Sequence, residues 1–250
     1  MKVILYIAIG LVLLSGSAWL WKAKMSASRQ QTAADIQRPK NENILRDYYR
    51  EDIESAKKQG KKEVILPGGI ATPTPDLSLE ELLRNYGLLR VKVIDKETTI
   101  YVSIPEIPSA DIETWYKVEI LETLHPQRKV SDEQPPFELP SRLLPLLPSE
   151  SLMVEQGGVI NVDGVTVVRE VCTEGVVYFP KEEYLIVGYL DYGGKLIRPS
   201  SGRASVFHVI NKRLMSCQKE RRLVREIEEK YGNDLDRLRS GVQLRLRREK

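Results

Sequence analysis

The sequence predicts a mainly β domain, a barrel or a sandwich, with flanking α-helices and an N-terminal membrane helix. Short segments rich in β-branched and aromatic residues follow one another between turn residues, which is typical of such folds. Helical periodicity occurs before and after these segments, and the chain begins with a long apolar run. At 250 residues with 42% hydrophobic content, the chain is large enough to bury a core.

The N-terminal run from Val3 to Trp21 carries no charge and has about the length that a helix needs to cross a bilayer. Lys2 and the small residues Gly16-Ser17-Ala18 also match the pattern of a signal peptide with its cleavage site. Residues 1–24 are therefore predicted to be either a signal peptide or a transmembrane anchor. The tryptophans at the end of the run resemble an interfacial belt and favour the anchor.

The charges that flank this run leave its orientation open. Lys22, Lys24 and Arg29 outweigh Lys2, and by the positive-inside rule alone the bulk of the chain would remain in the cytoplasm. An apolar segment at the extreme N-terminus with small residues near its end is more typical of export. We therefore expect the cell envelope: a single-pass protein facing outside the cytoplasm, or a secreted one after cleavage.

Residues 25–76 are predicted to contain a tether and an amphipathic helix. Up to Lys40 the sequence is polar, without an apolar period, and includes a proline. From Asn43 apolar residues recur at helical spacing to near Gly60. One face of this helix should dock on the β domain. Alternatively it lies on a membrane surface, an option that Lys57, Lys58, Lys61 and Lys62 support.

Residues 77–215 are predicted to be the β-barrel domain. Ser78 is a suitable N-cap for a short helix that ends near Tyr86. Asp95-Lys96-Glu97 is a plausible hairpin connection, and Asp163-Gly164 is the strongest hairpin signal in the chain. The predicted strands are Leu88–Ile94, Thr98–Ile104, Ile112–Leu121, Gly157–Asp163, Val165–Val171, Tyr184–Leu190, Lys195–Ile197 and Ser205–Ile210.

A proline-rich excursion at residues 125–148 interrupts this domain. Its prolines prevent regular strand pairing, and loops of this length inside a compact domain are usually functional or disordered. Four leucines lie among the last of these prolines: Leu143, Leu144, Leu146 and Leu147. They could form an apolar lid or a plug for one end of the barrel.

Residues 216–250 are predicted to be a charged helix that caps the β core, with its apolar period interrupted at Gly232. Its end, from Gln243 to Arg248, alternates apolar and basic residues. Such a segment could touch anionic lipid or an acidic partner, or be a solvated terminus.

Residues 114–122 and 179–188 resemble two segments of the netrin-like fold, the OB-type barrel of tissue inhibitors of metalloproteinases. Residues 114–122, with the sequence TWYKVEILE, are similar to the long strand that leads into a variable excursion in that family. Residues 179–188, with the sequence FPKEEYLIVG, resemble its Gly-x-x-Tyr-Leu-Val-Phe strand. The resemblance covers roughly Leu88 to Leu214 and implies an OB-like or netrin-like β-barrel.

The activity of those inhibitors is not implied. They chelate the protease zinc through an N-terminal cysteine, whereas the first cysteine here is Cys172. Lys181 also stands near the place where the family has glycine. The resemblance therefore concerns the fold, and it carries over no functional residue.

The residues provide no recognisable catalytic, metal or cofactor site. Two cysteines and two histidines are too few for zinc ligation, and Asn161 with Asp163 is too short a run for calcium. There is no nucleophile elbow, and the glycine pairs match no nucleotide-binding motif. His125 ends a strand, and His208 is expected to be a packed or surface residue.

The acid pairs Glu182-Glu183 and Asp111-Glu113 are expected to be ordinary surface carboxylates. With a net charge of only +3, we expect no nucleic acid partner. In an oxidising compartment Cys172 and Cys217 could form a disulfide.

Together these features predict a membrane-tethered or secreted, non-enzymatic binding module without a cofactor. Its partners are the membrane, through the N-terminal segment, and an unknown protein or small ligand. The alternative is an extracytoplasmic hydrolase whose site the sequence does not reveal. An enzyme should show a pocket of converging polar residues, and a binding module an exposed apolar patch or open barrel face.

Overall fold

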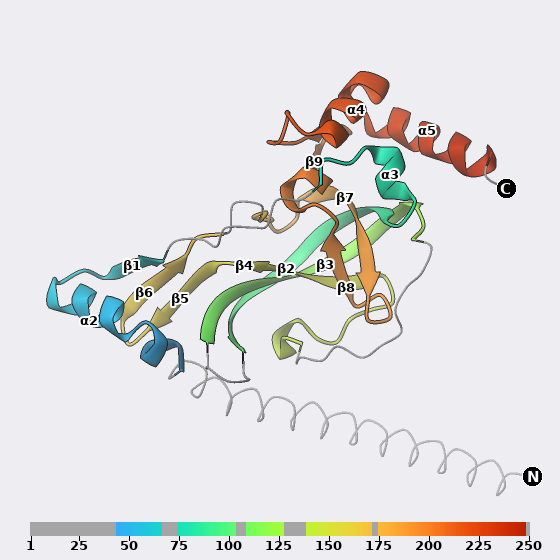
Figure 1. Cartoon of the computed structure of the whole chain (residues 1–250). Coiled ribbons are helices and arrows are strands. Elements are labelled where there is room, and N and C mark those ends of the chain that lie inside the picture. Colours follow the sequence, from blue (N-terminus) through green and yellow to red (C-terminus); the bar gives the residue numbers. More distant parts are fainter. Residues whose placement is uncertain (1–43, 67–74, 104–108, 128–138, 172–174, 249–250) are drawn as a thin grey trace, which may run out of the picture.

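The computed structural model describes residues 44–66, 75–103, 109–127, 139–171 and 175–248 (Figure 1). The predicted membrane segment and the tether lie outside these residues. Among the helices that are described, none is both long and apolar enough to cross a bilayer. The described fold is mainly β, with helices flanking the sheets.

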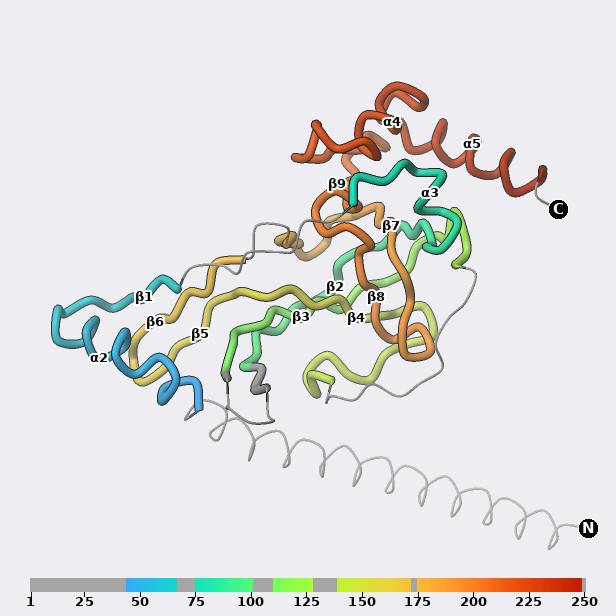
Figure 2. The backbone as a smooth tube through the Cα atoms, viewed as in Figure 1, coloured from blue at the N-terminus to red at the C-terminus, as the bar shows by residue number. Residues whose placement is uncertain are grey.

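The strands form two sheets (Figures 1 and 2). The larger sheet has seven strands in the order β10-β9-β7-β2-β3-β4-β8, and the smaller has three in the order β1-β6-β5. The strands are β1 (Glu63–Leu66), β2 (Gly87–Ser103), β3 (Ser109–His125), β4 (Glu150–Gln156), β5 (Gly158–Val162), β6 (Val165–Arg169), β7 (Glu183–Asp191), β8 (Leu196–Pro199), β9 (Val206–Ile210) and β10 (Arg213–Met215).

Five strands of the larger sheet pair in a ring, because β7 also pairs with β8. The ring closes unevenly. β2 and β3 pair along their whole length, from Leu88 to Ser103 on β2, whereas β4 and β8 share the single parallel register Leu152↔Leu196. Two hydrogen bonds strengthen this seam, from the Leu152 amide to the Lys195 carbonyl at 2.8 Å and from the Ser151 hydroxyl to the Gly194 carbonyl.

The ring encloses one apolar cluster, and helices cover part of its outside. Inside lie side chains from all five strands, such as Val91, Val118, Met153, Ile186 and Ile197. Outside, residues of β2, β3, β7 and β9 pack against α3 (Leu79–Leu83), α4 (Arg222–Tyr231) and α5 (Leu235–Arg248). These three helices lie together at one end of the molecule (Figure 2). The prediction that C-terminal helical sequence caps the β core is confirmed.

The small sheet lies at the opposite end of the molecule and packs on α2 (Arg50–Lys58) (Figure 1). Ile53 and Ala56 of α2 are buried against Val165 and Val167 of β6. The residues at 44–48 are helical as well, so the predicted helix is present. It docks on the β domain as expected, through its apolar face.

Several strand predictions were wrong. Asp95-Lys96-Glu97 is not a hairpin connection, because β2 runs through it with a register shift between Val93 and Asp95. The sequence analysis also missed β1, β4 and β10. A single barrel from Leu88 to Ile210 was expected, but β5 and β6 leave the ring and pair with β1 in the second sheet. The Asp163-Gly164 hairpin is present, with φ of 51° and 80° at its two residues.

Two short 3-10 helices complete the described fold: η1 (Ser141–Leu143) and η2 (Gly202–Ser205). The C-terminal helical sequence divides at Gly232, as predicted. This glycine ends α4 in the left-handed region at φ 62°, where a residue without a Cβ is favoured.

Candidate functional site

The small sheet exposes an apolar row on the face opposite α2. The register places Ile65 of β1 opposite Val168 of β6, which in turn lies opposite Val159 of β5. Ile65 is 60% exposed and Val159 is 56% exposed. Because side chains alternate along a strand, the neighbouring positions Val64, Val167 and Ile160 point to the other face, where they join the core with α2.

The row lies beside an edge strand. β1 is the last strand of the described sheet, and the Thr166 amide bonds to the Lys62 carbonyl while the Glu170 amide bonds to the Leu66 carbonyl. In a parallel ladder, the backbone groups of every second residue form hydrogen bonds with the same neighbouring strand, and those of the residues between them point the other way. The backbone groups of Glu63 and Ile65 therefore point away from β6. An extended segment could pair with this edge and place apolar side chains on the row.

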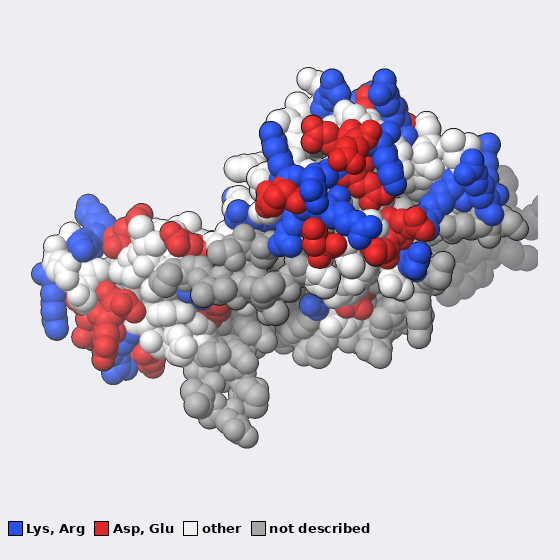
Figure 3. Space-filling view, turned by 45° about the horizontal axis from the view of Figure 1, so that its top comes forward, with Lys and Arg blue, Asp and Glu red and all other residues white. Residues whose placement is uncertain are grey.

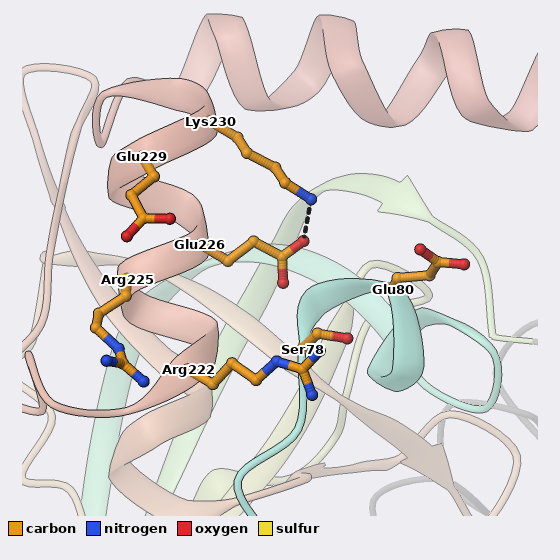
Figure 4. A pocket seen from close by; sticks show the side chains of 7 residues that line it. All are labelled: Ser78, Glu80, Arg222, Arg225, Glu226, Glu229 and Lys230. Atoms are coloured by element: carbon orange, nitrogen blue, oxygen red, sulfur yellow. Dashed lines mark hydrogen bonds and ion pairs between the residues drawn. The ribbon is translucent and has the colours of Figure 1, made fainter.

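A crevice of about 290 Å³ lies between α3 and α4, and every residue that lines it is polar or charged (Figure 4). The lining residues are Ser78, Glu80, Arg222, Arg225, Glu226, Glu229 and Lys230. In Figure 4, Lys230 reaches over to Glu226, and Glu80 faces them from α3.

Two of the lining residues, Glu226 and Arg222, connect the two helices. The Glu226 carboxylate accepts one hydrogen bond from the Leu79 amide at 2.7 Å and another from Lys230 at 2.8 Å. The Arg222 guanidinium pairs with Glu81 at 3.0 Å. The Ser78 hydroxyl is part of a capping box with Glu81. The crevice therefore holds no serine, cysteine or histidine available as a nucleophile with an adjacent base.

A different surface, the outer side of β3, β4 and β8, is covered by the end of the proline-rich excursion. Leu143 is buried against Trp115, Leu152 and Leu196. The Lys117 ammonium donates to the Pro145 carbonyl at 3.0 Å. Leu143 therefore packs on the outside of the ring, whereas the plug considered in the sequence analysis was for one end of the barrel. Leu147 differs, because it is 60% exposed.

Two carboxyl groups in this region have strongly raised pKa values. Burial raises the pKa of Glu113 to about 7, and Asp111 adds to the shift. Burial also raises the pKa of Glu155 to about 7, against the opposing effects of a hydrogen bond from the Val176 backbone and the charge of Arg203. The expectation that Glu113 is an ordinary surface carboxylate was therefore wrong. Asp111 instead forms an ion pair with Arg169 at 3.1 Å.

These two carboxyls do not form a catalytic pair. Opposed residues of an antiparallel pair point to the same face, and successive residues alternate. Glu113 lies opposite Gln156, whereas Glu155 lies opposite Thr114. Glu113 and Glu155 therefore point to opposite faces of the sheet and cannot act on one substrate atom from this arrangement.

Glu155 faces a group of tyrosines inside the ring. Tyr178 has no exposed surface, and its ring meets those of Tyr116 and Tyr184 edge to face at 5.0 Å. The Tyr178 hydroxyl has no hydrogen bond of standard geometry among the described residues. Its pKa is raised far above the usual value by burial and then by the Glu155 charge. We interpret this cluster as core packing.

The remaining acids and histidines singled out in the sequence serve structural contacts. His125 is the last residue of β3 and is buried. His208 stacks on Tyr184 with ring centroids 5.0 Å apart, and its Nε2 lies 2.9 Å from a Glu182 oxygen. Glu183 pairs with Arg90 at 2.6 Å. The expectation of a packed or surface histidine holds for His208.

The proposed disulfide stays a prediction. Cys217 is exposed, but Cys172 lies outside the described residues. Within the described part of the chain, no three His, Cys, Asp or Glu residues gather in a way that could hold a metal ion.

The sequence analysis missed the open apolar row. Ile65 belongs to the unpredicted strand β1, so its alignment with Val168 and Val159 could not be anticipated. The available signal for a sheet with two different faces was Thr166, which lies between the apolar residues Val165 and Val167. Comparison with known proteins adds no assignment, because neither a protein-family model nor a curated protein matches the chain.

Proposed function

We propose that this chain is a membrane-tethered or secreted, non-enzymatic interaction module that binds a protein partner on the open face of its small sheet. The row of exposed Ile65 and Val159, with half-buried Val168 between them, carries this proposal. Aligned apolar side chains left in water on one side of a sheet are typical of a surface that another protein covers.

The geometry favours a partner that contributes an extended segment. Such a segment can hydrogen-bond to the outward backbone groups of Glu63 and Ile65 on the β1 edge. Its alternate side chains would then continue the apolar row. A second row on the same face, made of Glu63, Thr166 and Asn161, offers polar groups that could fix the register of the bound segment.

We further propose that the ring is an OB-type barrel, as in the netrin-like fold. Counted along the chain, its strands are β2, β3, β4, β7 and β8. The first strand, β2, pairs with β3 and with β7. The third strand, β4, pairs with β3 and, in parallel, with β8, and β8 also pairs with β7. This order supports a partly open OB barrel. The usual ligand face of that fold, on the second and third strands, is here covered by the Leu143 segment.

Location in the cell envelope rests on the sequence. The uncharged run from Val3 to Trp21 supports delivery to a membrane, and its position at the N-terminus supports export of the domain behind it.

The rival function is an extracytoplasmic hydrolase, and the raised pKa values of Glu113 and Glu155 are the observation that favours it. Their opposite orientations on the sheet count against a shared active site. The crevice between α3 and α4 offers no nucleophile with a base. The observed surfaces are therefore better explained by an interaction module than by a hydrolase.

Site-specific photo-crosslinking of the full chain in its native envelope tests the proposal. A photoreactive residue at position 65 or 159 should capture one and the same protein, identified by mass spectrometry and then purified to confirm direct binding. The control is the same photoreactive residue at Glu228, which is exposed on α4. Capture should also fall in an Ile65→Lys or Val159→Lys background. Crosslinks no stronger than at position 228 would refute the proposal.

A further inference from the structure

We propose that the exposed face of α5, together with β10, is a contact surface for an anionic lipid bilayer. The inference rests on the membrane-tethered part of the proposed function and adds a second, electrostatic contact with the membrane.

α5 has two faces of different character. Leu235, Leu238 and Val242 are buried in the core beneath the helix. On the opposite side Arg237, Leu244 and Arg248 lie seven and four residues apart, which places them on one stripe of an α-helix. Leu244 is 56% exposed.

The arginines of the stripe have no acidic partner among the described residues. Arg239 forms a bidentate pair with Glu122, with both distances 2.7 Å, and it also contacts Asp236. Arg245 lies 3.9 Å from Glu80. By contrast, Arg237, Arg247 and Arg248 are exposed and form no salt bridge with any residue that the structure describes.

β10 extends the same face. Arg213 donates to the Gly232 carbonyl at 3.0 Å, and Arg237 reaches within 3.5 Å of the position that a Cβ on Gly232 would take. The two guanidinium groups therefore meet at the turn between α4 and α5. Met215, two residues after Arg213, points to the same side of β10 and is 56% exposed.

The nearby acids differ in how they are used. Asp236 pairs with Lys212 at 2.8 Å and with Arg239. Asp234 accepts a hydrogen bond from the Arg237 amide at 3.0 Å and adds one negative charge beside Arg213 and Arg237. Figure 3 shows Lys and Arg side chains gathered near the C-terminal end of α5. The face therefore carries a net positive charge, and it also exposes the apolar side chains of Leu244 and Met215.

This combination fits an anionic lipid surface. Arginine side chains near such a surface are attracted to the headgroups, and large apolar side chains between them can enter the boundary with the acyl chains. A soluble polyanion would use the charges but leave Leu244 and Met215 in water. The predicted anchor also places the domain close to a bilayer: residues 22–43 can span at most about 80 Å when fully extended.

Hydrogen–deuterium exchange on the full chain in proteoliposomes tests this inference. Vesicles of phosphatidylcholine alone are compared with vesicles that contain about one third phosphatidylglycerol. We expect exchange in residues 235–248 to slow on the order of tenfold in the anionic vesicles, and the protection to disappear at about 0.5 M NaCl. Peptides from β2 and β3 should exchange equally in both.

A charge-reversed variant and a matched control sharpen the test. Arg237→Glu/Arg247→Glu/Arg248→Glu should lose the lipid-dependent protection. Lys58→Glu/Lys61→Glu/Lys62→Glu, with the same change of charge at the exposed end of α2, should retain it. Equal exchange of α5 in both lipids, or loss of protection in the α2 control, would overturn the inference.

Two further measurements separate this contact from the proposed function. Flotation after a carbonate wash reports on the N-terminal anchor, and crosslinking at position 65 reports on the protein partner. Either can fail while α5 stays protected in anionic vesicles, and either can succeed while that protection is absent.

Discussion

The strands of both sheets are rich in apolar and β-branched residues, but the two sheets differ in which elements cover their faces. Strands β2, β3 and β7 of the ring, and β9 beside β7, are covered outside by α3, α4 and α5, so Leu88, Leu185 and Val187 are buried on that side. Among the described residues, α2 covers one side of the small sheet, whereas Ile65 and Val159 are exposed on its other side. A β-branched residue in a strand therefore marks a core position only where a second layer exists.

The largest effect expected from this difference concerns Val118. It is fully buried inside the ring, and Val118→Asp should destabilise the protein by more than about 4 kcal/mol, because the substitution buries an unpaired charge. Urea unfolding followed by circular dichroism measures this loss. Val159→Asp on the open face should cost no more than about 1 kcal/mol. Similar losses at both positions would mean that the open face is covered.

The Leu143 segment on the outer side of β3 and β4 provides the next test. Leu143→Ala should cost about 2–4 kcal/mol, because Leu143 is fully packed against Trp115 and Leu152. Leu147→Ala, four residues on, should change stability by less than about 0.5 kcal/mol, because Leu147 is exposed. The emission of Trp115 should also shift toward longer wavelengths in the first variant alone. Equal effects of the two substitutions would show that the segment does not pack on the ring.

A third test uses the Glu155 carboxyl. Its pKa is raised to about 7 in the folded protein, above the ordinary value of 4.5, so the folded state favours the protonated form. The stability that this preference supplies is present below about pH 4.5 and is lost as the pH rises through 7. The urea midpoint of the wild type should therefore fall as the pH rises from 5 to 8, and it should fall less in Glu155→Gln.

The matched control for this test is Glu170→Gln at an exposed position. It should leave the pH dependence of the wild type unchanged. A Glu155→Gln variant with the same pH slope as the wild type would mean that this carboxyl ionises normally.

The smallest effect separates the two faces of a single strand. Val168→Thr on the open face of β6 should change stability by less than about 1 kcal/mol, whereas Val167→Thr on the α2 face should cost about 1–3 kcal/mol. Thermal unfolding of both variants measures the contrast. If Val168→Thr proves the more damaging, the assignment of the two faces is reversed.

The sequence predicted those strands whose apolar pattern is both strong and bounded by turn residues. β5, β6 and β9 fall within predicted segments, and β7 extends one residue beyond its predicted segment at each end. The alternation of side chains along the predicted strands also makes Tyr116, Val118, Ile120, Leu185 and Val187 the expected core residues, and all of them except Ile120 are buried. Ile120 is only half-buried. Leu185 and Val187 pack beneath the helices and not inside the ring, because the sequence alone does not say which face of a strand a helix will cover.

The errors have identifiable causes. The charged triplet Asp95-Lys96-Glu97 looks like a turn, but the partners of β2 across the sheet hold the chain extended through it. β4 was missed because its residues Glu150 and Ser151 do not resemble a strand start, although both pair with β3. The raised pKa of Glu113 depends on burial that only the assembled structure reveals.

The narrow seam between β4 and β8 bears on the order in which the molecule assembles. Leu152 and Leu196 lie 44 positions apart in the sequence (196 − 152), with β5, β6 and β7 between them. Bringing two such distant strands together lowers the entropy of the chain before their contacts can stabilise it. The entropy loss is smaller for β2 and β3, because a short connection joins them. The long β2–β3 ribbon can therefore form early. The ring closes only when β8 reaches β4, which makes this seam a late step in folding and an early one in unfolding.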